Sequence, residues 1–174
     1  MADSPDSESI VWQGQFITAK TRGKWEYVSR ARGIKAAVIL AIEGEHVLLV
    51  EQYRVPLGAN CLELPAGLVG DVTAGEAVEA AAARELEEET GYRPARVTLM
   101  GEFYSSPGMV SESFFLVRAE GLEKVSEGGG VDDENIIVHR VKLDELNRFM
   151  DAKRTEGCAM DVKLLALLGP QLWR

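Results

Sequence analysis

Residues Gly70 to Tyr92 read GDVTAGEAVEAAAARELEEETGY, an Ala-rich segment that ends in a run of glutamates just before Gly91. Carboxylates in the last turn of a helix oppose its macrodipole, and like charges three or four residues apart repel one another. Glu85, Glu88 and Glu89 are spaced i, i+3 and i+4, so we expect them to share one helix face. Oxygen ligands grouped in this way suit a hard divalent cation. The alternative from charge alone is a solvated acidic helix end.

Local signals predict this helix and its limits. Thr73 to Glu76 fits a capping box, the alanines favour a helix, and Gly91 can end it in the left-handed conformation. We interpret Glu76 mainly as part of the cap. Arg84 stands four residues before Glu88, so we expect it to orient that carboxylate. Glu87 points away from the shared face and is expected to be solvated.

The spacing within this stretch resembles the Nudix box of hydrolases that cut nucleoside diphosphates linked to a further group. Five residues separate Gly70 from Glu76, seven more separate Glu76 from Arg84, and Arg84 to Tyr92 (RELEEETGY) fits the rest of the box without a mismatch. The resemblance implies the α+β Nudix fold, in which a mixed sheet lies between helices, here with a small N-terminal β-sheet subdomain.

Hydrophobic alternation divides the rest of the chain. Residues 1–8 are polar and acidic and read as a disordered tail, and 9–33 read as a β-hairpin, which the resemblance makes a dimerisation segment. The resemblance assigns 34–174 to the Nudix domain, with its box at 70–92. Further strands are predicted at 34–42, 46–53, 61–64, 97–104, 113–119 and 136–141, and further helices at 143–152 and 160–168.

Composition excludes several classes of function. A formal net charge of −9 argues against binding nucleic acid through its backbone, although local arginines and metal ions still allow a small anionic ligand. No apolar run is long enough for a membrane span, and no secretory signal is evident at the start. The two cysteines, Cys61 and Cys158, form no paired pattern, so we expect a reduced cytoplasmic protein.

The resemblance also implies a metal site and a general base. Mg²⁺, with Mn²⁺ as a possible substitute, is expected on Glu85, Glu88, Glu89 and the backbone carbonyl of Ala66, which stands in Glu-Leu-Pro-Ala-Gly; Arg84 supports this catalytic group. Glu134 is the preferred base, because family members carry theirs in a loop outside the box. Its rivals are Asp133, Asp132 and Glu112. Three glycines at 128–130 predict that the Glu134 loop is mobile, as a closing lid would be.

Within the family, the chain is most similar to the ADP-ribose pyrophosphatase subfamily. Pro107 lies 16 residues after Gly91, as in that group, and the segments EQYR (51–54) and KTRGKWEYVSR (20–30) agree with it. The similarity implies that Trp25 stacks on adenine, that Glu26 binds its polar edge, and that Arg30 and Arg54 grip the phosphates. Trp12 and Phe16 compete as the second stacking aromatic.

The expected activity is therefore Mg²⁺-dependent hydrolysis of ADP-ribose to AMP and ribose 5-phosphate by water attack on the diphosphate. The resemblance further implies a homodimer whose N-terminal segments reach across to the partner's site. Three alternatives stay open: hydrolysis of another nucleotide sugar such as GDP-mannose, a non-catalytic sensor that binds ADP-ribose, and an acidic interaction module without a ligand.

Overall fold

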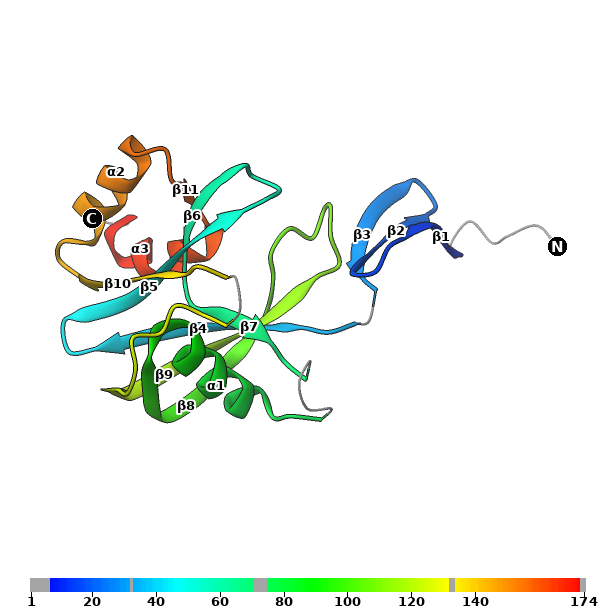
Figure 1. Cartoon of the computed structure of the whole chain (residues 1–174). Helices are drawn as coiled ribbons and strands as arrows, with labels where there is room; N and C mark the ends of the chain where they lie inside the picture. Colours follow the sequence, from blue (N-terminus) through cyan, green and yellow to red (C-terminus); the bar gives the residue numbers. More distant parts are fainter. Residues whose placement is uncertain (1–6, 32, 71–74, 132–133, 173–174) are drawn as a thin grey trace.

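A small sheet precedes the main body of the protein. The structure, a computed structural model, describes residues 7–31, 33–70, 75–131 and 134–172. β1 (Glu8–Gln13), β2 (Ile17–Arg22) and β3 (Trp25–Arg30) form an antiparallel sheet in that order, which stands to one side of the other elements (Figure 1). The predicted turn at residues 21–23 joins β2 to β3, and the segment before it supplies two strands in place of the one expected.

The main sheet is mixed, as expected for the α+β class. Its strand order is β11-β6-β5-β4-β9-β8, with β10 paired to β5 and β7 paired to β4. The pairs β4–β9 and β6–β11 are parallel, and the other pairs are antiparallel. The strands are β4 (Ala36–Glu43), β5 (His46–Arg54), β6 (Ala59–Glu63), β7 (Ala66–Leu68), β8 (Tyr92–Tyr104), β9 (Ser113–Lys124), β10 (Ile137–Lys142) and β11 (Ala159–Met160).

Helices cover both faces of this sheet because successive side chains of a strand point to opposite sides. In β4, Ile39 packs in one buried cluster with Leu86 of α1 (Val78–Thr90). Its neighbour Val38 packs in the other, with Met150 of α2 (Leu146–Thr155) and Leu164 of the 3₁₀ helix η1 (Val162–Leu164), which leads into α3 (Leu165–Leu172). Figure 1 shows α1 on one side of the strands and α2 and α3 on the other.

The predicted start of α1 is wrong. The helix begins at Val78, and the residue before it, Ala77, makes no side-chain cap hydrogen bond. Thr73 lies outside the described residues, and Glu76 pairs with Arg84 instead of capping. The predicted end is confirmed, since Gly91 has φ +76° and its N–H donates to the Glu87 carbonyl.

Other element boundaries also differ from the prediction. β8 begins directly after Gly91 and includes Pro94, which an edge strand tolerates because one side of its backbone needs no partner. The strand β7 was not expected, α2 begins three residues later than predicted, and the C-terminal helix is divided into η1 and α3. None of the helices in the described residues is long and apolar enough to cross a membrane.

Candidate functional site at the end of helix α1

The turn before β7 lies directly against the last turns of α1. The backbone carbonyl of Pro65 accepts a hydrogen bond from Ile39 N–H, which fixes the turn to β4 (2.8 Å). Ala66 N–H donates to Glu89 Oε2 (3.0 Å). A Cβ on Gly67 would lie 1.9 Å from Cδ of Glu85, so only glycine allows this close approach. The backbone of Ala66 and Gly67 therefore lies within reach of two of the three predicted metal ligands.

Arg84 forms ion pairs with three carboxylates near this turn, those of Glu76, Glu85 and Glu88. Its Nη1 donates to Glu85 Oε1 at 3.0 Å and to Glu88 Oε2 at 3.2 Å, and its Nη2 lies 3.4 Å from Glu76 Oε2. Burial alone would lower the pKa of Arg84, but its hydrogen bond to Glu76 and the negative charges of Glu85 and Glu76 raise it. The expected contact between Arg84 and Glu88 is present, and Arg84 also links Glu85 and Glu76 to the same cluster.

Glu89 is the buried member of the group, with 8% of the residue exposed. Burial raises the pKa of its carboxyl to about 8, and the negative charges of Glu85 and Glu134 act in the same direction. The hydrogen bond from Ala66 N–H and the positive charge of Arg54 oppose this rise. An acid that is buried beside other acids is costly to ionise, and a bound cation would remove that cost.

The donor set fits a hard divalent cation, although the carboxylates have separate protein partners in this structure. Within the described part of the chain, no three His, Cys, Asp or Glu side chains converge as a ready metal site. Glu85 and Glu88 contact Arg84, while Glu89 contacts the Ala66 amide. Carboxylate oxygens beside a backbone turn are nevertheless the ligands that Mg²⁺ and Mn²⁺ prefer.

The glycine-rich loop before Glu134 packs on the end of α1. The N–H groups of Gly129 and Gly130 donate to the carbonyls of Glu89 (2.8 Å) and Glu88 (3.1 Å), which the helix itself leaves without donors. A Cβ on Gly128 would lie 2.4 Å from the carbonyl carbon of Thr90. Close packing against α1 is thus one structural reason for these glycines, and the mobile lid stays a prediction.

Glu134 lies beyond these glycines and influences Glu89 electrostatically. One of its carboxylate oxygens accepts a hydrogen bond from Val131 N–H (2.9 Å), which holds the side chain over its own loop. Its rivals Asp132 and Asp133 lie outside the described residues. The remaining rival, Glu112, forms an ion pair with Arg30, so it has a partner that sequence reasoning did not assign.

A cavity of about 320 Å³ adjoins the turn at Ala66 and Gly67. Arg30 and Arg54, the two predicted phosphate-binding residues, both line it. Arg54 makes a two-point contact with the buried carboxylate of Glu63, at 2.6 and 2.9 Å. Sequence reasoning missed Glu63, and the available signal was a charged residue at the end of an apolar strand, directly before Leu64 and Pro65.

The predicted adenine-binding residues do not line this cavity. Trp25 is 64% exposed and lines a second cavity of about 340 Å³, on the small sheet, together with Pro107. Glu26 is exposed on the same strand. Trp12 and Phe16, the two candidates for the second stacking aromatic, are exposed on the small sheet as well. The structure of one chain thus brings the acidic residues and the predicted phosphate-binding residues together and leaves Trp25 and Glu26 apart.

Cys61 and Cys158 are buried and unpaired, and burial raises the pKa of the Cys61 thiol to about 12, which makes it unreactive. Glu87 was expected to be solvated only, but it forms two hydrogen bonds with Arg93, both 2.8 Å long.

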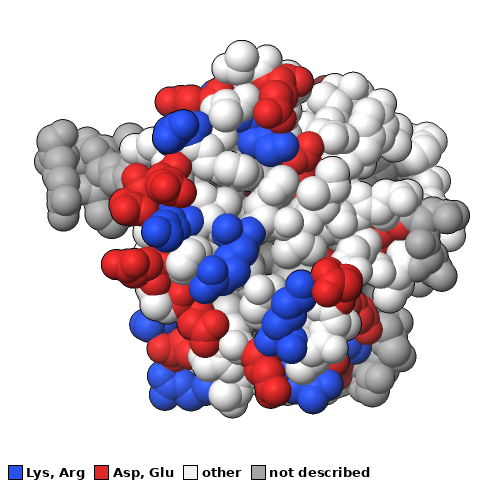
Figure 2. Space-filling model, turned by 60° about the vertical axis from the view of Figure 1, so that its left-hand side comes forward, with Lys and Arg blue, Asp and Glu red and all other residues white. Residues whose placement is uncertain are grey.

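On the face shown in Figure 2, basic side chains are interspersed with acidic ones, in contrast to the continuous basic surface that a nucleic acid requires.

Comparisons with known proteins find pyrophosphatases among the relatives of this chain. An ADP-ribose pyrophosphatase from Bacillus subtilis is 36% identical over 120 residues, which cover 68% of this chain and 63% of that protein. A GDP-mannose pyrophosphatase from Cronobacter sakazakii is 34% identical over 156 residues, covering 84% of this chain and 76% of that protein. The crystal structure of an ADP compounds hydrolase superposes with a TM-score of 0.69 at 23% identity, covering 95% of this chain and 91% of that one.

The extent of these matches shows the family of this chain and leaves its activity to be proposed. The chain spans 57% to 64% of the length of the first curated relatives that it matches. The structural neighbour is too distant in sequence to show more than a shared fold. The sequence model of the NUDIX domain matches residues 32–160, which is most of the chain. This match, the pyrophosphatase relatives and the arrangement around α1 identify the chain as a member of the Nudix family.

Proposed function

We propose that the protein is a metal-dependent pyrophosphohydrolase that cleaves ADP-ribose to AMP and ribose 5-phosphate. The observation that carries this proposal is the position of the acidic end of α1. Glu85 and Glu89 meet the backbone of Ala66 and Gly67, and the cavity beside that backbone contains Arg30 and Arg54. Carboxylates for a cation therefore adjoin guanidinium groups for phosphates. The pyrophosphatase relatives support the same class of reaction.

Glu85, Glu88, Glu89 and the carbonyl of Ala66 would hold Mg²⁺, with Mn²⁺ as a substitute. The metal, when bound, neutralises diphosphate charge and lowers the pKa of attacking water. Arg84 orients Glu85 and Glu88 through the contacts at 3.0 and 3.2 Å. Glu134 accepts the proton of the water, since the loop that carries it packs against the end of α1.

Arg54 and Arg30 bind the phosphates in this proposal. A planar guanidinium offers paired donors to phosphate oxygens, and two hydrogen bonds to Glu63 fix the orientation of the Arg54 side chain. Arg30 is held by Glu112 in the same cavity. Two arginines that are oriented in advance lose less side-chain entropy when a diphosphate binds.

We also propose a homodimer in which the small sheet of one subunit, residues 9–33, completes the site of its partner with Trp25 and Glu26. Large apolar side chains on this sheet are exposed in the single chain, a feature of surfaces that become buried on association. They are Ile10, Val11, Trp12, Phe16, Ile17 and Trp25. The two buried, unpaired cysteines support a reducing compartment such as the cytoplasm.

A second nucleotide sugar, GDP-mannose, is the alternative substrate, because the Cronobacter sakazakii relative aligns with most of this chain. We expect ADP-ribose to have the higher kcat/KM when both compounds are assayed with Mg²⁺ and one enzyme preparation. If GDP-mannose is cleaved more efficiently, the substrate is reassigned while the hydrolytic class stands. Tight binding of ADP-ribose without turnover in excess Mg²⁺ would instead identify a sensor.

Two substitutions in one helix turn test the metal site itself. Glu85→Gln is expected to lower kcat about 100-fold or more, because it removes a charge that the reaction needs only in the metal complex. Glu87→Gln is the matched control, since its side chain contacts Arg93 on the exposed side of the same turn. Equal activity of the two variants would refute the assignment of Glu85.

A further inference from the structure

Strand β10, which begins three residues after Glu134, has a free edge. Among the described strands, β10 pairs with β5 alone. Leu143 N–H donates to the Glu45 carbonyl (2.8 Å), which fixes the alternation of hydrogen-bonded pairs along this ladder. By that alternation, the backbone N–H and C=O groups of Val138 and Arg140 point away from β5. These groups are available to a further strand.

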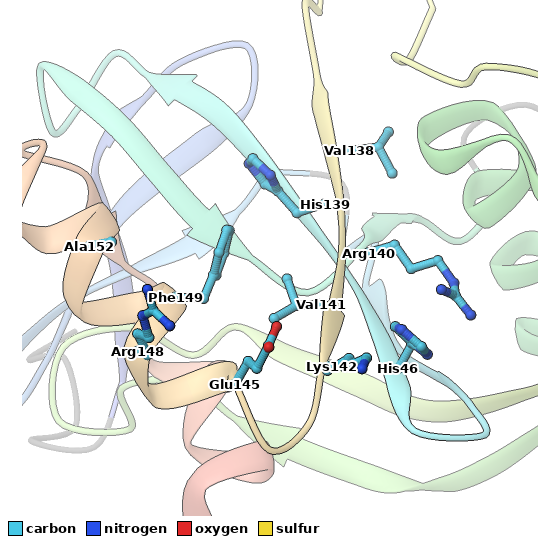
Figure 3. A pocket seen from close by; sticks show the side chains of 10 residues that line it. All are labelled: His46, Val138, His139, Arg140, Val141, Lys142, Glu145, Arg148, Phe149 and Ala152. Atoms are coloured by element: carbon cyan, nitrogen blue, oxygen red, sulfur yellow. The ribbon is translucent and has the colours of Figure 1, made fainter.

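A cavity of about 680 Å³ opens along this edge, between β10 and α2. Figure 3 shows its lining: Phe149 and Arg148 come from α2 on one side of the β10 ribbon, while Arg140 and His46 lie on the other. The cavities at Arg54 and Trp25 are about half as large, at 320 and 340 Å³. The β10 cavity therefore offers room for several residues of an extended chain beside exposed backbone groups.

The charges of this cavity are unusual for the molecule. Most lysines and arginines in the described residues form ion pairs with acids, as a chain with a formal net charge of −9 allows. In the described part of the chain, the cations without a recorded ion pair are Lys24, Arg140, Lys142 and Arg148. The last three all line the β10 cavity, where Glu145 is the single acidic residue.

We propose that β10 and this cavity bind an extended acidic segment of a partner protein by strand addition. The main chain of the segment would pair with Val138 and Arg140. Val141 packs toward α2, so Arg140 and Lys142 lie on the other face of the sheet. Carboxylates on one face of the added strand would therefore meet Arg140 and Lys142, and those on the other face would meet Arg148. A second copy of the chain is a poor occupant, because pairing β10 with itself would bring Arg140 and Lys142 against their own copies. A small anion would use the cations but not the strand edge.

Protection of an edge strand against aggregation is the competing explanation for Arg140 and Lys142. It accounts for charges on the strand itself. It does not account for Arg148, which lies on α2 across the cavity, or for the size of the cavity. The combination of open backbone, cavity and cations on both sides favours binding.

The probe is a fluorescent peptide of eight glutamates, which presents carboxylates on both faces of an added strand; it is titrated by anisotropy into the protein. We expect saturable binding that weakens as salt rises. Arg140→Glu combined with Lys142→Glu, and separately Arg148→Glu, should each weaken it about tenfold or more. Lys24→Glu is the matched control, because it reverses another unpaired cation on the small sheet and should leave the affinity unchanged. Unchanged circular dichroism spectra and urea-unfolding midpoints show that all variants are folded.

Methylated peptides distinguish strand addition from simple charge attraction. Every second N–H of an added strand faces the protein, so N-methylation of one alternate set should abolish binding and N-methylation of the other should be tolerated. Hydrogen exchange at the amides of Val138 and Arg140 should slow in the complex. Equal effects of both methylated sets, equal effects of Lys24→Glu and Arg148→Glu, or binding of inorganic phosphate with no binding of the peptide would overturn the proposal.

Discussion

At the scale of single residues, the acidic end of α1 is tolerated because each carboxylate has a specific compensating contact. Arg84 spans Glu85 and Glu88, and the Ala66 amide donates to Glu89. These contacts only partly offset the burial of Glu89, whose pKa stays raised to about 8. A residue that lowers stability and is nevertheless surrounded by supporting donors is characteristic of a functional site.

Replacing Glu89 should therefore separate stability from activity. Without divalent metal at pH 7, Glu89→Gln is expected to raise the free energy of unfolding by about 2 kcal/mol. The raised pKa keeps the folded carboxyl mostly protonated at a pH where the unfolded one ionises, whereas a neutral amide avoids this cost and still accepts from Ala66 N–H. The same variant should lose at least about 99% of its activity with Mg²⁺. Urea unfolding in EDTA and a kcat measurement test both parts. A Glu89→Gln protein that unfolds more easily than the wild type would contradict this account.

The sequence predicts residues of this site to the extent that their partners are local. Glu85, Glu88, Glu89 and Arg84 belong to one helix, so their spacing predicts the shared face and the contact between Arg84 and Glu88. The ion pair of Glu63 with Arg54 joins separate strands, and that of Arg30 with Glu112 joins residues 82 apart. No local pattern encodes such contacts, which is why Glu63 was missed and Glu112 was taken as a rival base.

At the scale of elements, one buried carboxylate, that of Glu51, links the strands β5, β6 and β10 to helix α2. Glu51 of β5, 6% exposed, accepts hydrogen bonds from Asn60 of β6 (2.9 Å) and pairs with His139 of β10 (2.9 Å). Lys153 of α2 lies 3.0 Å from the same carboxylate. Burial alone would raise the pKa of Glu51, but the hydrogen bonds from Lys153, Asn60 and His139 outweigh it and lower the pKa.

The lowered pKa of Glu51 predicts how stability depends on pH. Because the folded value lies below the unfolded value of about 4.3, the contribution of Glu51 is complete above that pH and is lost as pH falls through the folded pKa. Glu51→Gln should cost about 2 kcal/mol at pH 7, and the difference from the wild type should shrink below pH 4.

Urea unfolding at pH 7 and pH 3.5 measures this difference. Glu156→Gln is the control, since Glu156 contacts the same Lys153 nitrogen at 3.0 Å but is 63% exposed, so its removal should change stability by less than about 0.5 kcal/mol. Similar losses for the two variants, or a Glu51→Gln effect that is independent of pH, would show that the buried contacts are not the source.

The ends of helices and strands were predicted where their cause lies in neighbouring residues and missed where it lies in residues distant in the sequence. The end of α1 was predicted because Gly91 acts through its own backbone conformation, with φ +76°. The start was wrong because the helix begins at Val78, later than the capping sequence at residues 73–76 predicts. The glycines at 128–130 suggested flexibility, whereas the packing of Gly128 against Thr90 depends on a contact that the sequence does not reveal.

At the scale of the whole molecule, the class of fold follows from the order of strands and helices, but the sheet order does not. The parallel pairing of β4 with β9 joins strands that are more than 70 residues apart. The position of the small sheet was equally hidden, because alternation predicts strands without showing what they face. In the single chain, Trp25 and Arg54 line different cavities, and this separation is the structural reason to expect a second subunit.

A mixing experiment tests whether two subunits form each site. Trp25→Ala and Glu89→Gln should each lower kcat/KM for ADP-ribose, the first through adenine stacking and the second through the metal site. If Trp25 contributes to the site of the partner subunit, a hybrid dimer has one of its two sites with both residues intact. Half of the dimers in an equal mixture are hybrids. About a quarter of the wild-type activity should therefore return. Subunits are exchanged by mild denaturation and refolding, and each variant treated alone is the control. No subunit of the mixture has both Trp25 and Glu89 intact. Activity that stays at the average of the two variants would therefore place Trp25 in the site of its own chain.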